Sequence, residues 1–393
     1  MTIYDVIVIG SGPAGSLAAQ RLASSGHSVL VLEKKERAGK ETCCTGIISR
    51  ECYEQFPVDT DVILREARAA SLYSPSGKQI RVAREKTQAY IVNRSAYDDR
   101  LARSARAAGA TYLFQHPVIR VSLEGDGVTV YTSGDTTTCY HAKTVLVANG
   151  FTSRISLDLG LGRVTEFAMG AQAEVAVNGM EEIEIYTGRN IAPGFFAWLV
   201  PTSDNKALAG LMGMNNTGMR LKEFISCLIK SGKIISGDYE IKYAGIPLKP
   251  LPRTFTDRIL VVGDAAGQVK PTTGGGIYFS LLCAEMAAET LQYAFNKNDF
   301  TSVKMAEYEK MWHKKLSREL SIDYWAHRLY TGFTDNQLEH VLDIVNTRKI
   351  AEGFARDDSL SFDWHAGPIW KMFKNHAIRG IIRTINPWYT GRD

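Results

Sequence analysis

The glycines near the amino terminus have types and spacing that suit phosphate binding. Gly10, Gly12 and Gly15 follow an apolar run at 5–9 in the pattern G-x-G-x-x-G. In such a strand-to-helix turn the first glycine permits a tight turn, the second admits a pyrophosphate and the third lets the helix pack closely. Ala14 begins the expected helix, whose free N–H groups attract an anion. We predict a dinucleotide cradle, with a glycine-rich turn that binds nothing as the alternative.

An acidic residue stands where the ribose of such a cofactor would bind. Glu33 ends the second expected strand, 28–32. A carboxylate there suits the ribose hydroxyl pair and repels a 2′-phosphate, so the position favours an ADP-ribose group without that phosphate. A turn that binds nothing does not explain this acid.

A second glycine-rich junction lies roughly 250 residues further along the chain. Asp264 follows the buried run 258–262, and the three glycines 274–276 come just before a helix expected from Ile277. Asp264 can accept hydrogen bonds from a ribityl hydroxyl, and the glycine backbone can approach another anionic or carbonyl-bearing edge of a ligand. Two junctions of this kind predict one long cofactor lying across a sheet, which is FAD.

An aromatic segment and a cysteine pair are the other candidate sites. In residues 193–201, Pro-Gly-Phe-Phe-Ala-Trp-Leu-Val-Pro, strand alternation puts Phe196 and Trp198 on one face. The segment is either a core strand or an apolar wall over a flavin. Cys43 and Cys44, followed by Gly46, have either a structural role or a role facing the cofactor.

The pattern of expected elements predicts an α/β fold. It is a doubly wound, Rossmann-type FAD-binding domain with an inserted β-rich substrate domain and a helical C-terminal region. The boundaries expected are 1–60, 93–155 and 255–300 for the FAD domain, 61–92 and 156–254 for the substrate domain, and 301–393 for the helical region. Within them we expect a hairpin turn at Pro75 to Gly77 and helices at 306–329 and 376–385. Asn149 and Gly150 are expected at a strand end, where open α/β sheets bind ligands.

Composition narrows the functional classes. A net charge of +4 over 393 residues argues against a nucleic-acid partner, and six cysteines without a C-x-x-C pair argue against a metal site. No stretch has the ~18 to 20 apolar residues of a membrane span, and a strand expected almost at Met1 leaves no room for a signal peptide. We expect a protein of the cytoplasm or of a membrane surface. Trp364, Trp370 and Trp388 among lysines and arginines suit a membrane interface or an ordinary helical cap.

These motifs together resemble the geranylgeranyl reductase family of flavoproteins, a branch of the p-hydroxybenzoate hydroxylase-like fold. The resemblance covers roughly residues 3 to 300 and depends on the first glycine turn with Glu33, on Cys44-Thr-Gly46, on segment 193–201 and on Gly263 to Ile277 with its Lys-Pro-Thr-Thr-Gly-Gly-Gly. Segment 94–98 also resembles a family helix start. Asn149 departs from the aspartate of many relatives.

The resemblance implies flavin-dependent hydrogenation of C=C bonds in geranylgeranyl chains on a lipid, a diphosphate or a related carrier. It implies an isoprenoid lipid substrate and an electron donor that is NAD(P)H or a ferredoxin. It gives catalytic roles to Cys44, beside the flavin, and to Trp198 and Phe196, which with Phe195 supply apolar surface for the prenyl chain. The residues expected to contact FAD are Gly10, Gly12, Ala14, Gly15, Glu33, Cys44, Gly46, Arg94, Arg100, Val118, Asp264, Gly274, Gly275, Gly276 and Ile277. The alternatives are a flavin monooxygenase or halogenase acting on an aromatic substrate, and an electron-transfer flavoprotein.

Overall fold

The computed structural model describes residues 2–134, 137–151, 154–235, 237–347, 361–367 and 369. The chain forms two compact units of three segments each. Unit 1 comprises Met1–Thr42, Asn93–Phe167 and Ile246–Leu320, and unit 2 comprises Cys43–Val92, Ala168–Gly245 and Ser321–Asp393. The chain leaves unit 1 after Thr42 rather than near residue 60, because β3 (Ile47–Ser49) pairs with β7 (Ala89–Val92) in unit 2. The assignment of unit 1 as the FAD domain and of unit 2 as the substrate domain stays a prediction.

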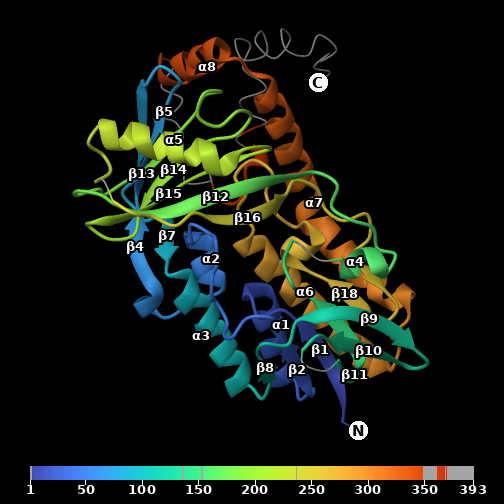
Figure 1. The fold of residues 1–393 in the computed structure, drawn as a ribbon. Coiled ribbons are helices and arrows are strands. Elements are labelled where there is room, and N and C mark those ends of the chain that lie inside the picture. Colours follow the sequence, from blue (N-terminus) through green and yellow to red (C-terminus); the bar gives the residue numbers. More distant parts are fainter. Residues whose placement is uncertain are drawn as a thin grey trace, which may run out of the picture. The chain divides into compact units, whose positions relative to one another are not determined.

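Unit 1 is organised by a mostly parallel sheet, visible in Figure 1 at the N-terminal end of the chain. Its main strand order is β17-β18-β11-β1-β2-β8, and β10 and β9 continue from β11 as an antiparallel pair. The strands are β1 (Ile3–Ile9), β2 (Val29–Leu32), β8 (Thr111–Leu113), β9 (Val118–Glu124), β10 (Gly127–Thr132), β11 (Thr138–Val147), β17 (Phe255–Thr256) and β18 (Ile259–Val261). The first strand pairs in parallel with both β2 and β11, so their carboxyl ends share one edge.

Helices and the β9–β10 pair bury the strands of this sheet. Ile7 and Ile9 form one cluster with Val121, Val128 and Val130 of the β9–β10 pair. The helices α1 (Pro13–Ser24), α3 (Arg94–Ala107) and α6 (Ile277–Lys297) pack against one another through α1. The short elements α4 (Ile155–Asp158) and η2 (Gly263–Ala266) complete unit 1. The strands β2 and β18, and β1 from Val6 to Ile9, are continuous apolar runs because both of their faces are buried.

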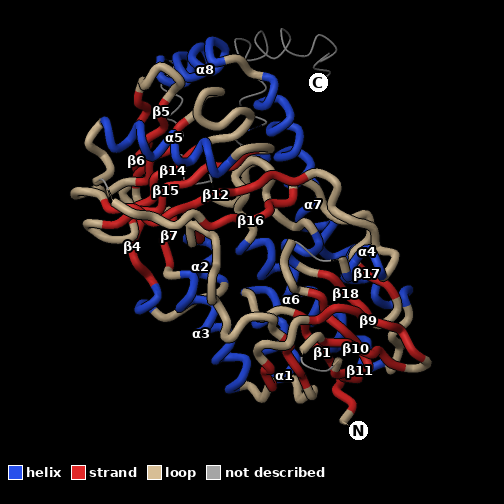
Figure 2. The backbone as a smooth tube through the Cα atoms, viewed as in Figure 1, coloured by secondary structure: helices blue, strands red, loops and turns tan. Residues whose placement is uncertain are grey.

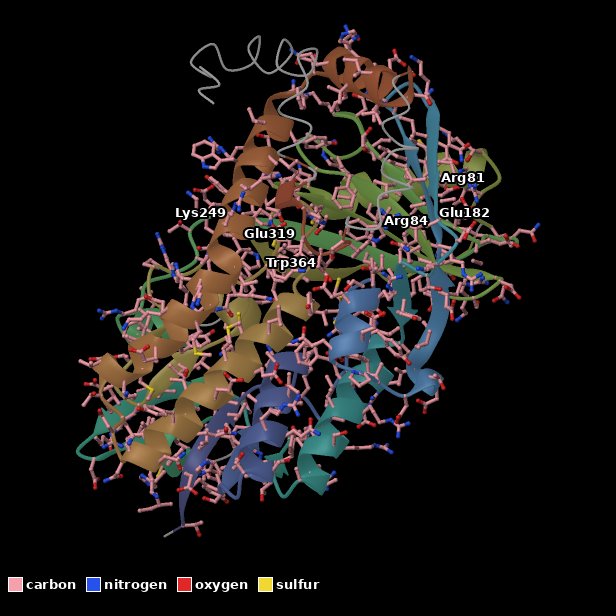
Figure 3. All side chains as sticks on the ribbon, turned by 180° about the vertical axis from the view of Figure 1, so that it is seen from behind. Arg81, Arg84, Glu182, Lys249, Glu319 and Trp364 are labelled. Carbon is pink, nitrogen blue, oxygen red and sulfur yellow. The ribbon has the colours of Figure 1, made fainter. Side chains whose placement is uncertain are left out.

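Unit 2 contains a seven-stranded sheet in the order β16-β12-β15-β14-β13-β5-β6. Figure 2 shows β12, β14, β15 and β16 side by side as red strands. The strands are β5 (Ala69–Tyr73), β6 (Gln79–Ala83), β12 (Phe167–Ala176), β13 (Ile183–Tyr186), β14 (Ala197–Pro201), β15 (Lys206–Gly213) and β16 (Lys242–Pro247). The hairpin expected around Pro75 to Gly77 is confirmed as β5–β6. Arg81 and Glu182, labelled in Figure 3, join this hairpin to the start of β13 at 2.9 Å from Nε to Oε1.

The two faces of the large sheet have different partners. Phe224 of α5 (Thr217–Lys230) meets Tyr186 edge-on, with ring centroids 5.0 Å apart. On the opposite face, Ile91 of the small sheet clusters with Ile183, Val200 and Trp198. This small sheet has the order β3-β7-β4, with β4 at Ile63–Ala67, and it is accompanied by α2 (Arg50–Gln55) and η1 (Thr60–Val62).

Two helices form the described part of the C-terminal region. The predicted helix at 306–329 is longer in the structure, α7 (Ser302–Gly332), and it is followed by α8 (Asp335–Thr347). The first turns of α7 are anchored to the sheet of unit 1, because the Tyr308 hydroxyl donates to the Val261 carbonyl at 3.0 Å. Within the described part of the chain, none of the helices has the length and apolar character needed to cross a membrane. The helix expected at 376–385, Trp370 and Trp388 lie outside the described residues.

Candidate active site

The first glycine turn has the steric character that the sequence predicts. A Cβ on Gly10 would lie 2.5 Å from the Ala148 carbonyl oxygen, and one on Gly15 would lie 2.0 Å from the Gly10 carbonyl oxygen. Gly10 also has φ +103°, a conformation that side chains oppose. No atom lies within 4 Å of a Cβ built on Gly12, and no side chain caps α1. The turn therefore leaves open space and N–H groups at the helix start, as an anion requires.

The carboxylate of Glu33 is held against this turn. Its Oε2 accepts hydrogen bonds from the Ser11 N–H and the Ser11 hydroxyl, both at 2.8 Å, and its Oε1 accepts from the Lys35 N–H at 3.0 Å. Only 8% of Glu33 is exposed. The two Ser11 donors use both lone pairs of Oε2, whereas Oε1 has a second lone pair and can still accept a ribose hydroxyl.

The second junction places an acid, an arginine and a glycine run together. A Cβ on Gly276 would lie 3.0 Å from Oδ1 of Asp264, so glycine is what lets this carboxylate approach the start of α6. Burial raises the pKa of Asp264, while the positive charge of Arg94 lowers it. Arg94 in turn donates to Asp98 one helical turn later, at 2.9 Å from Nη2 to Oδ1. Burial likewise raises the pKa of Asp98, and Arg94 opposes that shift.

The remaining predicted cofactor residues in unit 1 have simple positions. Ala14 is buried in the first turn of α1, and Ile277 is the first residue of α6. Gly274 has φ +69°, and the Gly275 carbonyl accepts the Lys270 N–H at 3.1 Å, which closes the turn. Val118 begins β9 beside the core. Arg100 follows Arg94 by six residues, about 240° around the helix, so the two arginines lie on different faces of α3.

Unit 1 fits the FAD that the motifs predict. Its two helix starts lack a side-chain cap. Oδ1 of Asn149, just beyond the end of β11, is buried and has no hydrogen-bond partner among the described residues. A buried unpaired acceptor at the carboxyl edge of a parallel sheet is a position for a ligand donor. Glu33 and Asp264 are the acids that the sequence predicts for the ribose and ribityl hydroxyls, and both roles stay predictions.

The cysteine pair lies in unit 2, in a turn shaped by Gly46. The Gly46 N–H donates to Sγ of Cys44 at 3.4 Å, and the Gly46 carbonyl accepts the Val92 N–H at 2.9 Å. Gly46 has φ +72°, which favours glycine at this position. Burial, with a smaller contribution from Cys44, raises the pKa of Cys43 to about 11. Cys43 therefore stays a neutral thiol near neutral pH.

Trp198 lies flat over a glycine on the neighbouring strand. A Cβ on Gly210, its partner in β15, would be 2.4 Å from Cζ2 and 2.7 Å from Nε1 of the indole. The ring of Phe196 contacts that of Trp198 with centroids 5.9 Å apart, although Phe196 lies just before β14. The expected association of these two aromatic side chains is thus confirmed.

Phe195 does not belong to this aromatic surface, contrary to the sequence expectation. It is 2% exposed, its ring packs on His327 with centroids 4.7 Å apart, and its carbonyl accepts the Tyr330 hydroxyl at 2.8 Å. Phe195 lies in the turn before β14, where its N–H donates to the Ala192 carbonyl at 2.9 Å, and neighbouring residues of an extended chain point to opposite sides, so its ring does not join that of Phe196.

Gln172 is a candidate site residue that sequence reasoning missed. It is 6% exposed in strand β12, where its two neighbours are alanines, and its Nε2 donates to the Cys44 carbonyl at 3.3 Å. The amide thus connects the cysteine turn to the large sheet. A polar residue between Ala171 and Ala173 was the only signal in the sequence.

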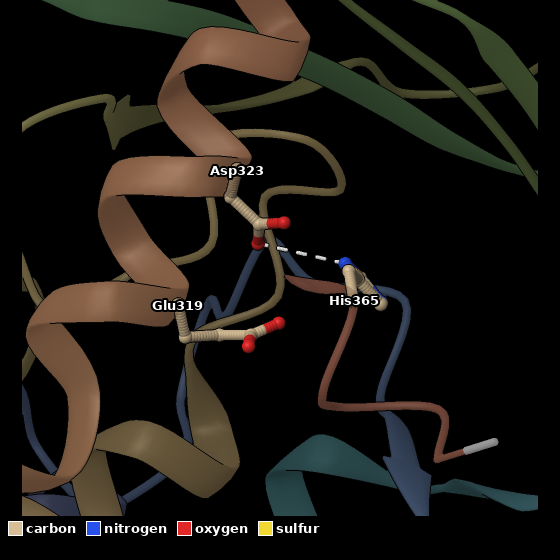
Figure 4. Close-up of side chains that lie close together, drawn as sticks. All are labelled: Glu319, Asp323 and His365. Atoms are coloured by element: carbon tan, nitrogen blue, oxygen red, sulfur yellow. Dashed lines mark ion pairs between the residues drawn. The ribbon is translucent and has the colours of Figure 1, made fainter. Parts of the chain in front are cut away.

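A carboxylate and an imidazole fasten the last described segment to α7 (Figure 4). His365 Nδ1 lies 3.5 Å from Oδ2 of the fully buried Asp323, and Glu319 precedes Asp323 by one turn of the same helix. In the same segment, Trp364, labelled in Figure 3, donates its indole N–H to Glu51 Oε1 at 2.9 Å. For Trp364 these contacts favour a structural role over a membrane interface.

Comparison with known proteins agrees with this geometry. The family described as lycopene cyclase protein matches residues 5–360. A digeranylgeranylglycerophospholipid reductase from Methanocaldococcus jannaschii is 31% identical over 86% of this chain and 89% of its own length. One of the same name from Methanococcus aeolicus is 29% identical over 88% and 91%.

Solved structures show the same fold. A geranylgeranyl bacteriochlorophyll reductase-like protein from Thermoplasma acidophilum superposes with a TM-score of 0.82 and 25% identity over 99% of this chain and 98% of that one. A flavin-dependent brominase has a TM-score of 0.71 at 17% identity over 98% and 100%, a likeness of fold alone. With this coverage and the matching FAD cradle, the chain belongs to the geranylgeranyl reductase family of FAD-dependent flavoproteins, within the group that the lycopene cyclase family describes.

Proposed function

We propose that this protein is an FAD-dependent reductase that hydrogenates the C=C bonds of geranylgeranyl chains carried on a glycerophospholipid. The observation that carries the proposal is the match, along most of both chains, with digeranylgeranylglycerophospholipid reductases. The retained Cys44-Thr-Gly46 turn and the Trp198 surface support it, because these are the parts of unit 2 that the resemblance assigns to catalysis.

The residues of unit 1 bind the cofactor in this proposal. Reduced FAD supplies hydride to one carbon of the alkene. Glu33 accepts a ribose hydroxyl. The free N–H groups at the N-terminus of α1 bind the pyrophosphate. The positive charge of Arg94 opposes the rise that burial causes in the pKa of Asp264, which favours the carboxylate form that accepts ribityl hydroxyls.

Cys44 supplies the proton to the second alkene carbon. Its Sγ already accepts the Gly46 N–H, a contact that stabilises the thiolate left after proton donation. Trp198 and Phe196 present apolar surface for the prenyl chain, and each methylene buried there contributes about 0.8 kcal/mol. An alkene lacks a carbonyl to stabilise charge, so orientation of the chain is a large part of catalysis.

The electron donor and the location follow from the substrate. We propose NAD(P)H or a ferredoxin as the electron donor. The sequence has one G-x-G-x-x-G turn followed by a ribose-type acid, and in this proposal that turn binds FAD rather than the donor. A double-chain lipid substrate requires access to a membrane surface, and we propose peripheral contact with it. Sedimentation with vesicles that contain archaeal-type ether lipids tests this contact.

The decisive experiment supplies FAD-loaded protein with digeranylgeranylglycerophospholipid and dithionite without oxygen. A reductase yields products heavier by one hydrogen pair for each reduced bond. Unchanged lipid, together with fast NADPH oxidation in air and a hydroxylated aromatic product, would overturn the proposal in favour of a monooxygenase.

A further inference from the structure

One cross-strand row of the large sheet carries two buried polar atoms without partners. The row follows the strand pairing: Gln172 pairs with Gly210, Gly210 with Trp198, and Trp198 with Ile185. Residues paired in this way place their side chains on the same face of a sheet. Gln172, Trp198 and Ile185 therefore share one face, on which Gly210 supplies no side chain.

The polar atoms on this face are a donor and an acceptor. Nε1 of Trp198 and Oε1 of Gln172 are both buried, and neither has a hydrogen-bond partner among the described residues. An indole nitrogen can only donate, and an amide oxygen can only accept. A buried polar atom left without a partner is costly, so such a pair in a native protein calls for a physical explanation.

The glycine brings the two atoms toward each other. Backbones two strands apart are separated by about 10 Å in a sheet. The edge of the indole that carries Nε1 lies directly over Gly210, with Nε1 2.7 Å from where a Cβ would stand, so the ring covers the strand that separates Trp198 from Gln172. The other end of the Gln172 amide is fixed, because its Nε2 donates to the Cys44 carbonyl. That bond sets the orientation of the Gln172 amide.

We propose that Trp198 and Gln172 form a two-point site for a single hydroxyl group, which accepts the indole N–H and donates to the Gln172 carbonyl. Ether and ester oxygens do not fit, because they cannot donate. The hydroxyl belongs either to an ordered water or to an alcohol group of the ligand. The site lies beside the apolar side chains of Ile183, Ile185 and Val200 on this face, so it gives that apolar part of the face a polar point of recognition. The choice of prenyl probes rests on the proposed function, whereas the site does not.

Binding to the FAD-loaded protein, measured by calorimetry, tests the site without turnover. The probes are geranylgeraniol and its methyl ether, which differ only in the ability to donate. The variants are Trp198→Phe, Gln172→Met and the double variant, with Trp325→Phe as control because Trp325 is 63% exposed. Thermal midpoints are recorded with and without lipid.

If a ligand hydroxyl fills the site, the parent binds the alcohol about tenfold more tightly than the ether. Both single variants and the double variant lose this preference to the same extent, because one hydroxyl needs both partners. If water fills the site, alcohol and ether bind equally, and without lipid the double variant has a thermal midpoint no lower than that of the less stable single variant, because one water needs both partners. Equal binding together with additive losses of midpoint would overturn the site, since losses of packing and of the Gln172–Cys44 bond add independently.

Equal binding of the two probes together with raised thermal midpoints in the variants would overturn it, since removing a polar atom that nothing satisfies stabilises a protein. Failure of the proposed function leaves these readouts intact. A protein that hydrogenates no lipid still shows the hydroxyl site in its binding and melting behaviour, and an active reductase with equal probe binding and raised midpoints lacks the site.

Discussion

Replacing Gly210 by alanine tests whether the indole of Trp198 is held flat on the sheet. The added Cβ would lie 2.4 Å from Cζ2 and 2.5 Å from Cε2 of the ring. Carbon atoms in good contact are about 3.5 to 4.0 Å apart, so the ring must move by more than about 1 Å. Overpacking of this kind typically costs about 1–3 kcal/mol of unfolding free energy.

The cost should depend on the indole itself. In a Trp198→Ala background the added methyl group meets open space, and Gly210→Ala should be neutral or slightly stabilising there because alanine restricts the unfolded chain. We expect a coupling energy of about 1–3 kcal/mol between the two positions. Gly237→Ala is the control, since no atom lies within 4 Å of its Cβ position and its φ is ordinary.

The assay is urea unfolding followed by circular dichroism, alongside FAD retention and geranylgeranyl reduction. Gly210→Ala should lower the unfolding midpoint and reduction rate while retaining FAD, because the cradle belongs to the other unit. The reasoning is refuted if Gly210→Ala is as stable as Gly237→Ala, or if the cost of Gly210→Ala is the same with and without the indole.

Other substitutions test the cofactor and proton assignments. Glu33→Arg should raise the dissociation constant of FAD by more than about tenfold in equilibrium dialysis, whereas Glu36→Arg, at an exposed carboxylate, should not; equal retention in both variants would contradict the role of Glu33. Cys44→Ser should keep FAD yet slow anaerobic alkene reduction by about 10²–10⁴-fold, and Cys43→Ser should stay near the parent; a fast Cys44→Ser enzyme assigns the proton elsewhere. Alkylation of Cys43 by iodoacetamide should stay slow until the pH approaches its pKa of about 11, because only the thiolate reacts; rapid labelling at pH 8 would show that the thiol is not buried. The pKa of Asp264 is raised in the folded state, so the apoprotein has its full stability below the unfolded pKa and loses stability as the pH rises through the folded pKa. Asp264→Asn should therefore stabilise the apoprotein at pH 7 in thermal melts while weakening FAD binding, and a destabilised variant would contradict this sign.

The sequence predicted those features that depend on local geometry. The turns at Gly10 and Gly274 require a positive φ or a close approach of the backbone, and glycine is the residue type that meets these requirements. The apolar runs of β1 and β18 likewise identify strands buried on both faces. The helix ends were less well placed, because α7 continues past the expected limits through contacts with distant residues.

Features that depend on pairing between distant segments were not predictable. Gln172 meets the carbonyl of Cys44 across 128 positions, and only the fold brings them together. Phe195 and Phe196 are neighbours in an aromatic run, yet the first packs against α7 and the second contacts Trp198, and the sequence does not show which long-range partner each ring has. Nothing in the sequence indicates that Gly210 makes room for an indole, because its pairing with Trp198 is known only from the strand register.

The discontinuity of both units has a consequence for synthesis. The main sheet of unit 1 needs β1 at residues 3–9, β11 ending at residue 147 and β18 ending at residue 261. A ribosome delivers these strands in that order, so the edge formed by β18 cannot close until two thirds of the 393-residue chain has emerged. Until then the last three residues of β11, Val145 to Val147, expose an unpaired apolar edge, because β10 covers only residues 138–142 of that strand, and such edges promote aggregation of nascent chains. Truncations that end before residue 261 should therefore be insoluble even though they contain the whole glycine turn, and the complete chain should depend on chaperones that shield that edge during translation.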